Sequence, residues 1–348
     1  MESYELSERE KSILRYVIHQ FILTANPVGS RNIAKKYELG LSPATIRNIM
    51  ADLEESGFLR HPHTSAGRLP TDRGYRVYVD SLMDPPELGL NDKKFIDTGL
   101  EVEHGDTDGL LKITASVLSD LTKQLACVTY PTFERAVLQK IQLVHLSTTR
   151  IMVVISIKSG LVKTITLELN TEIDENRIYS VQSFLNERLS GLKLSDIRET
   201  FAERVKDFYS GETKPIIRVF LDSVDKIFAD DNVVDKTFIR GAGNILKQPE
   251  FVDHENLQGI IELIEDKNIV IHIMEKYRAQ KDGLSISIGN ENKNSKFSEY
   301  SLISKEYNIG DVKGVLGIIG PKRMEYSKVV ATVVYLAEQL SKELKKID

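Results

Sequence analysis

Apolar residues recur at helical spacing three times within the first eighty residues. Ser7 and Glu10 have the spacing of a capping box, and an apolar stripe follows them to about residue 24. A turn with proline and glycine ends this stripe, and a short amphipathic segment comes next. A third segment opens with Ser42 and Pro43 and closes at Gly57, as a capped helix does. The pattern therefore predicts three helices joined by short turns.

The third of these helices has a polar face that suits DNA recognition. Its apolar stripe consists of Ile46, Ile49, Met50 and Leu53. Short or hydrogen-bonding side chains near the start of such a helix can reach base edges in the major groove. The candidate DNA-binding positions at this end are Ser42, Ala44, Thr45, Arg47 and Asn48.

A small basic hairpin is expected directly after this helix. The stretch FLRHPHTSAGRLPT, residues 58–71, has two short extended pieces around a turn, with Arg60 and Arg68 on its flanks. A polar helix face alone, or a Gly-Ser turn with two arginines alone, is typical of solvated surface. Their order within eighty residues favours a winged helix. His61 and His63 lack the further ligands that a zinc site needs, so no metal is expected.

Composition narrows the class of protein. Hydrophobic residues make up 41% and charged residues 28%, as in a soluble globular protein. The net charge of −5 argues against a non-specific polyanion binder, but residues 30–76 hold 8 Lys or Arg and 5 Asp or Glu, a local net +3. The acidic start is no signal peptide, no apolar run is long enough to span a membrane, and the single Cys127 fits a reducing compartment. We expect a cytoplasmic protein.

The rest of the chain mixes strands and helices. An amphipathic helix that includes Leu125 precedes three β-rich runs, KIQLVHL, IMVVISI and LVKTITLEL, which short polar turns favour as an antiparallel meander. Helical segments follow, and then strands and a last helix at about 325–346. We expect one α+β domain interrupted by a helical insertion. The expected parts are a DNA-binding domain at 1–82, a linker at 83–105, the α+β domain at 106–170 and 251–348, and the insertion at 171–250.

No stretch has the pattern of a catalytic site. GAGNIL has Leu246 where a dinucleotide fingerprint has its third glycine, and GVLGIIGPKR lacks the Lys-Ser or Lys-Thr pair of a phosphate loop. GNENKNSKFSEY, residues 289–300, is either a ligand-binding loop or a plain surface loop. We expect neither enzymatic activity nor a cofactor.

Five motifs occur in order along nearly the whole chain: LSPATIRNIMADLEESGFL with HTSAGRLPTDRGYRVYVD, IQLVHL, GAGNILKQPEF, SISIGNEN and GVLGIIGPKRMEY. In these motifs the chain resembles the HrcA family of bacterial heat-inducible transcription repressors. The resemblance implies a winged helix-turn-helix domain, a GAF-like domain and an inserted dimerising domain. It also implies a homodimer that binds an inverted-repeat operator, the CIRCE element, upstream of chaperone operons, with the GroEL chaperonin supporting repression.

The same resemblance assigns roles within the DNA-binding motif. It implicates Thr45, Arg47 and Asn48 in base reading. The wing contacts that it implies are Arg60, His63, Thr64, Ser65 and Arg68. Two alternatives remain open: a regulator gated by a small molecule in the GAF-like domain, and an enzyme with a DNA-binding tether. The second has no nucleophile–base pair in the sequence to support it.

Overall fold

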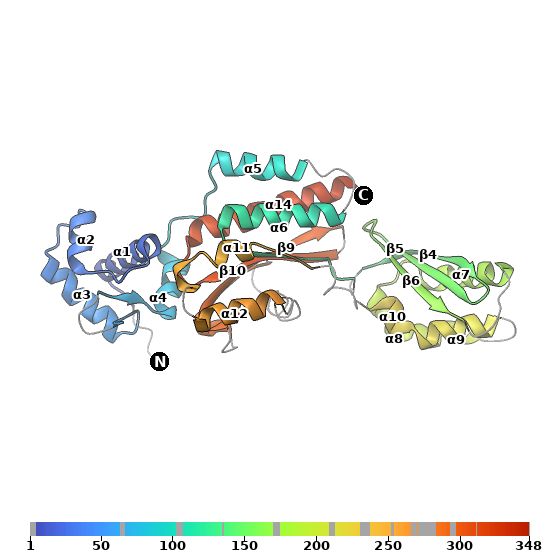
Figure 1. Ribbon diagram of the computed structural model, residues 1–348. Coiled ribbons are helices and arrows are strands. Elements are labelled where there is room, and N and C mark those ends of the chain that lie inside the picture. Colours follow the sequence, from blue (N-terminus) through green and yellow to red (C-terminus); the bar gives the residue numbers. More distant parts are fainter. Residues whose placement is uncertain are drawn as a thin grey trace.

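The structure is a computed structural model that describes residues 5–62, 67–101, 107–133, 136–169, 175–208, 213–229, 237–251, 254–265, 270, 283–292, 297–310 and 312–347. The elements form three units in a row (Figure 1). We name them the N-terminal unit (described residues of 5–83), the central unit (those of 84–133 and 237–347) and the inserted unit (those of 136–229). The central unit lies between the other two (Figure 1).

The N-terminal unit packs helices around a small core, with a two-stranded ribbon between its third and fourth helices. The capping box opens α1, because the Ser7 N–H donates to Glu10 at 2.8 Å and the Glu10 N–H donates to Ser7 Oγ at 3.3 Å. The expected helices are therefore confirmed, with an antiparallel ribbon after the third. Its elements are α1 (Glu8–Thr24), α2 (Ser30–Lys36), α3 (Pro43–Glu55), β1 (Leu59–Arg60), β2 (Leu69–Pro70), α4 (Asp72–Val77) and the π-helical turn η1 (Tyr78–Leu82).

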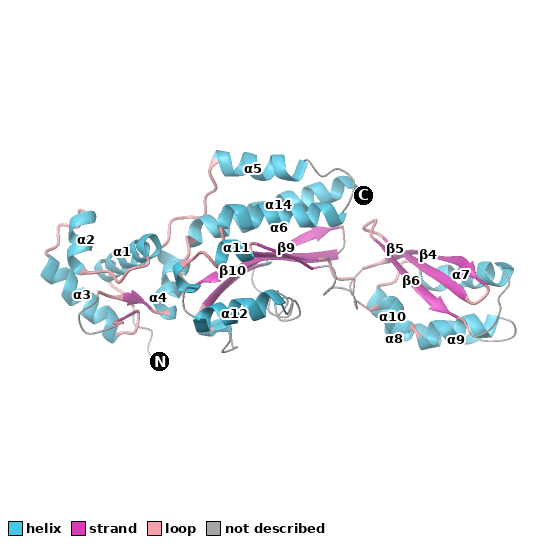
Figure 2. Cartoon of the chain, in the orientation of Figure 1, coloured by secondary structure: helices cyan, strands magenta, loops and turns pink. Residues whose placement is uncertain are grey.

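The central unit is built on a five-stranded antiparallel sheet with strand order β7-β3-β10-β9-β8. Helices α6 and α14 cover one face of the sheet, α5 packs outside them, and α12 lies on the opposite side (Figures 1 and 2). Its elements are α5 (Leu90–Glu101), α6 (Thr107–Thr122), β3 (Leu125–Thr129), β7 (Thr237–Arg240), α11 (Ala242–Ile245), η4 (Pro249–Phe251), α12 (His254–Glu265), β8 (Leu284–Ile288), η6 (Gly289–Asn292), β9 (Tyr300–Ile309), β10 (Val312–Pro321) and α14 (Tyr326–Ile347).

The inserted unit is a separate three-stranded antiparallel sheet, ordered β4-β5-β6, with helices packed on one face. Burial alternates along β5, with Ile151, Val153 and Ile155 turned toward the helices. Its elements are β4 (Leu138–Ser147), β5 (Arg150–Ile157), β6 (Val162–Glu168), α7 (Glu175–Leu189), α8 (Leu194–Val205), η2 (Lys206–Phe208), α9 (Lys214–Asp222) and α10 (Val224–Phe228).

The three β-rich runs form the meander that the sequence predicts, but the expectation about their domain is wrong. Among the strands that the structure describes, they pair only with one another, whereas residues 106–170 were expected to share a sheet with the C-terminal strands. The strand that does join the central sheet from the expected insertion is β7, which pairs with β3. Alternation of apolar residues specifies a strand and its buried face but not the sheet that the strand joins. The sheet to which these strands belong could therefore not be predicted from the local sequence.

Two further boundaries differ from the expectation. The segment 83–105 contains α5, whose Ile96 and Leu100 are buried, so it is not simply a linker. The amphipathic helix was expected to include Leu125 but ends at Thr122, and Leu125–Thr129 is a strand with every residue buried. Cys127 lies in this strand and is fully buried, as its apolar setting indicates. Among the described helices, none is long and apolar enough to cross a membrane.

Candidate nucleic-acid interface

The N-terminus of α3 presents a polar surface that its own cap holds in place. Ser42 precedes the helix, and its Oγ accepts a hydrogen bond from the Thr45 N–H at 3.1 Å, with Pro43 in the first turn. The Ser42 and Thr45 hydroxyls lie 3.0 Å apart. An N-cap of this kind satisfies a backbone donor that the helix leaves unpaired. The start of α3 is therefore sharply defined.

The apolar side of α3 determines which residues face outward. Ile46, Met50 and Leu53 are buried against the other helices, and Ile49 is half-buried. The exposed positions at this end are Ser42, Pro43, Ala44, Thr45, Arg47 and Asn48. The five candidate DNA-binding positions are thus all exposed at the N-terminal end of α3.

Arg47 and Asn48 are the side chains of this surface best suited to read bases. Both are exposed, and neither forms a hydrogen bond or ion pair with any other residue that the structure describes. An unpaired guanidinium and an unpaired carboxamide match the donor and acceptor edges of guanine and adenine. Nothing described in the chain competes for their hydrogen bonds.

The ribbon β1/β2 is attached to the loop before α2. Arg68 and Val28 exchange backbone hydrogen bonds of 2.9 Å in both directions. A Cβ at Gly67 would overlap the Val28 backbone, so a glycine is required for this close approach. The expected wing residues His63, Thr64 and Ser65 lie outside the described residues.

Arg68 is the least exposed of the described candidate residues. Its side chain is 15% exposed, and its Nε lies 2.8 Å from Glu54 Oε2 on α3. His61 contacts both Arg68 and Glu54 through its two ring nitrogens. These contacts hold the ribbon against α3. Within the described chain, no set of three or more His, Cys, Asp or Glu side chains has the arrangement of a metal site.

Arg60 faces the central unit. It lies opposite Leu69 in the ribbon and lines a cavity of about 160 Å³ together with Tyr75 and, from the central unit, Phe251 and Arg323. The structure therefore does not bring Arg60 and Arg68 together. Burial raises the pKa of Tyr75, on α4, well above its usual value.

Some contacts that organise this surface were not anticipated from the sequence. Arg73 stacks on the Phe58 ring at 4.4 Å and donates to the Ser56 carbonyl at 2.8 Å, so it covers the C-terminal end of α3. Thr71 caps α4 and donates to the Gly57 carbonyl at 2.7 Å. The sequence offered one signal of this packing, which is Gly74 inside the helical pattern TDRGYRVYV. A glycine within a helix often marks a place where another backbone segment approaches closely.

Exposed basic residues on α2 were also not among the candidates. Arg31 and Lys35 are exposed on the helix that packs against α3. Their spacing in the sequence matches no known motif. Only the packing of α2 against α3 places them near the exposed N-terminal end of α3.

The chain is similar to known proteins over nearly its whole length. A family model described as the HrcA protein C-terminal domain matches residues 108–330. The heat-inducible transcription repressor HrcA of Chlorobium phaeobacteroides (strain BS1) is 40% identical over 355 residues, covering 99% of this chain and 100% of the relative. The repressor of the same name from Prosthecochloris aestuarii (strain DSM 271 / SK 413) is 39% identical and covers 98% of each chain.

A solved structure shares the fold. A crystal structure described as that of a hypothetical protein has a TM-score of 0.63 and 22% sequence identity, and it covers 99% of this chain and 100% of that one. The family assignment rests on the sequence identity to the repressors, which extends over nearly the full length of the chain. The chain belongs to the HrcA family of heat-inducible transcription repressors.

Proposed function

We propose that this repressor binds an inverted-repeat operator, the CIRCE element, as a homodimer, with a winged helix-turn-helix in each N-terminal unit. The observation that carries the proposal is the unpaired, exposed face of α3 that holds Arg47 and Asn48. In this arrangement Thr45, Arg47 and Asn48 read bases in the major groove. Arg31 and Lys35 of α2 would contact the phosphates beside them, which position the helix without reading sequence.

The inserted unit supports a dimer because one face of its sheet is open and partly apolar. Val144 is 41% exposed on β4, and its cross-strand partner Met152 on β5 is half-buried. Val162, 48% exposed, lies on the same face of β6. The helices described in this unit pack on the opposite face, so a second copy seated on the face that holds Val144 and Val162 would bury these side chains.

The experiment that tests this function is protection of DNA. The purified full-length protein should protect a chaperone-operon promoter fragment that contains the inverted repeat, and should leave a scrambled repeat of equal composition unprotected. Protection should extend over both half-sites. Equal affinity for both fragments would contradict sequence-specific repression through this surface.

A second candidate function is ligand gating through the central unit. A hollow of about 420 Å³ lies beside β7 and is lined mainly by residues 237–242, with Ile264 of α12 opposite them. This volume is within the range of small-molecule sites. Its lining offers few polar groups that converge on one point, so we place it second. A thermal shift of the pure protein with a fractionated metabolite extract, together with a change in operator affinity, would favour gating over a constitutive repressor.

A further inference from the structure

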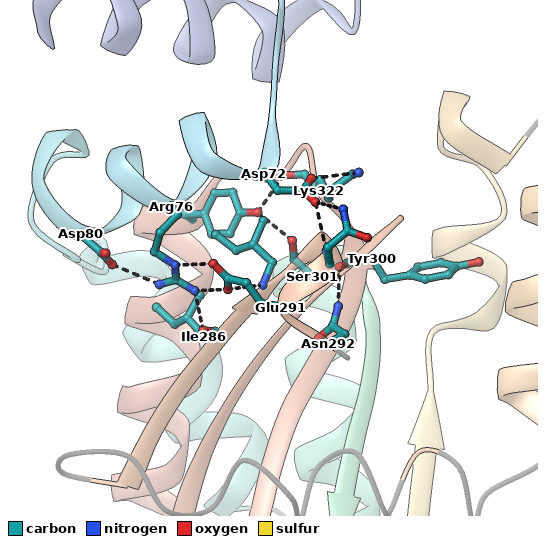
Figure 3. Close-up of polar contacts among 12 residues, drawn as sticks. Asp72, Arg76, Asp80, Ile286, Glu291, Asn292, Tyr300, Ser301 and Lys322 are labelled. Atoms are coloured by element: carbon teal, nitrogen blue, oxygen red, sulfur yellow. Dashed lines mark hydrogen bonds and ion pairs between the residues drawn. The ribbon is translucent and has the colours of Figure 1, made fainter. Parts of the chain in front are cut away.

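Two of the sequence motifs that carry the family resemblance meet at the junction between the N-terminal and central units. SISIGNEN contributes the end of β8 and the turn η6, and GPKRMEY contributes the residues that link β10 to α14. Both contact α4, the helix that follows the ribbon (Figure 3). The described residues 289–292 of the loop GNENKNSKFSEY thus form an inter-unit contact.

Arg76 makes the central contact of this junction. Its Nε donates to Glu291 Oε1 at 2.8 Å and its Nη2 to Glu291 Oε2 at 2.5 Å, so the pair is bidentate (Figure 3). The same Nη2 donates to the Ile286 carbonyl at 2.7 Å. Glu291 is held from its own side by the Ile288 N–H at 2.9 Å. A planar guanidinium bound in this way has a fixed direction, unlike a lysine ammonium.

Asp72 makes a second contact, one turn earlier on α4. Its Oδ2 accepts from the Asn290 N–H at 3.0 Å and from Asn290 Nδ2 at 2.8 Å, and its Oδ1 lies 3.0 Å from Lys322 Nζ. Gly289 precedes Asn290 with a φ of +56°, and a Cβ there would overlap the Asp72 carboxylate. A glycine is therefore required at 289 both by its backbone and by the approach of α4.

A third contact joins the central unit to α1. Arg323 Nη1 donates to the Ile22 carbonyl in the last turn of α1 at 2.8 Å, and its Nη2 donates to Glu250 Oε2 at 3.0 Å. The three contacts attach two different helices of the N-terminal unit. Because Thr71, next to Asp72, is bonded to the end of α3, the attachment extends to the reading helix.

We propose that Arg76 and Asp72, with Glu291 as partner, are positioning residues for operator binding. They hold α3 at one orientation relative to the rest of the chain and so determine which half-site spacing a dimer can span. This inference rests on the proposed binding of an inverted repeat by a dimer. Without these contacts, the packing of Tyr75 on Tyr326 would remain, but the N-terminal unit would be less restrained and could reorient about the segment at 83–89 while each reading helix stayed intact.

The first test measures orientation without DNA. Spin labels at Lys35→Cys on α2 and Glu338→Cys on α14 report one intramolecular distance, because both positions are exposed and the native Cys127 is buried. Labelled protein is mixed with excess unlabelled protein so that distances within one chain dominate. We expect a narrow distance distribution that becomes clearly broader in Arg76→Gln and in Asp72→Asn. A distribution as narrow as that of the parent chain in both variants would overturn the proposal, whatever DNA the protein binds.

The second test measures DNA binding by the same full-length variants. For Arg76→Gln, we expect affinity for a single half-site to stay within about twofold, and affinity for the full inverted repeat to fall at least about tenfold as the gain from joint binding is lost. The penalty for inserting about five base pairs, half a helical turn, between half-sites should also shrink. Arg218→Gln, an exposed arginine in the inserted unit, is the charge-matched control.

The outcomes separate this proposal from the proposed function. Equal loss on half-site and full repeat would show that Arg76 only stabilises the reading unit, and an unchanged spacing penalty would show that it does not position α3; either result overturns the proposal. Failure of the parent chain to prefer the repeat over the half-site would instead contradict the dimeric function. Asp72→Asn keeps an acceptor for Asn290 while it loses the charge facing Lys322, so it remains a gentler variant if Arg76→Gln unfolds.

Discussion

Arg60 and Arg68 point to opposite faces of the β1/β2 ribbon. Arg60 is paired with Leu69, and successive side chains of a strand alternate between faces, so the neighbouring Arg68 is turned the other way. Arg60 lines the cavity at the central unit, whereas Arg68 meets Glu54 of the reading helix. One ribbon face thus meets α3, which we propose reads DNA, and the other meets the junction with the central unit.

This division leads to a test by salt dependence. If Arg68 contacts phosphate in the complex, Arg68→Ala should flatten the plot of log affinity against log salt by about one unit. Arg60→Ala should leave the slope unchanged, because its side chain faces the central unit. Affinities of the full-length variants at several salt concentrations give the slopes.

The matched control for Arg68 is Glu54→Gln. It breaks the same ion pair and leaves the arginine in place, so the slope should stay the same or steepen. If Arg68→Ala and Glu54→Gln both weaken binding with an unchanged slope, then Arg68 acts only by holding the ribbon against α3.

Arg47 allows the reading surface to be tested by sequence preference. Arg47→Ala should cost about 1–3 kcal/mol on the operator if the guanidinium reads a base, and much less on a scrambled duplex. Competition binding against both duplexes measures this difference, with Arg218→Ala in the inserted unit as control. Equal weakening on the two duplexes would assign Arg47 to phosphate.

The N-terminal unit could be predicted from the sequence because its signals are local. Ser7 and Glu10 are three residues apart, Ser42 caps the helix that it precedes, and the stripe of Ile46, Met50 and Leu53 defines the outward face without knowledge of the rest. The candidate positions on α3 follow from these signals alone.

The remaining features depend on contacts between distant segments. The Glu54 partner of Arg68 lies on the neighbouring helix, and Arg76 binds Glu291, 215 residues further along the chain. The exclusion of β4 from the central sheet is also a matter of pairing, since its alternation would suit either sheet. No periodicity of apolar residues carries such information, so these features emerged only from the structure.

Gly74 should be intolerant of any side chain. It is buried at the start of α4, and a Cβ there would overlap the Phe58 carbonyl oxygen, which is fixed by a hydrogen bond from the Thr71 N–H at 3.1 Å. We expect Gly74→Ala to lower the free energy of unfolding by about 1–3 kcal/mol, the usual cost of overpacking. Gly243→Ala, where the added methyl meets open space, is the control and should be neutral. Equal denaturation midpoints for the two variants would contradict this packing.

The open face of the inserted sheet provides a test of the dimer. Val144→Glu places a charge on that face, at the edge strand β4, where a second copy seated on the face would have to desolvate it. We expect a monomer by sedimentation, a retained half-site affinity and a marked loss on the inverted repeat. Leu246→Glu, at a 38% exposed leucine of the central unit, should remain dimeric. A dimeric Val144→Glu protein would place the interface on another surface.

The response to heat should depend on a partner that recognises the folded repressor. The N-terminal unit meets the central unit through the polar contacts of Asp72 and Arg76 and through the buried rings of Tyr75 and Tyr326, and interfaces between domains commonly permit relative motion. We propose that the GroEL chaperonin maintains the binding-competent form, which mass action would favour in proportion to free chaperonin. Operator occupancy should therefore rise with added chaperonin, fall when a denatured client competes for it, and decay on brief heating in its absence. Occupancy that survives heating and ignores chaperonin would rule this mechanism out and leave the ligand-gated function as its replacement.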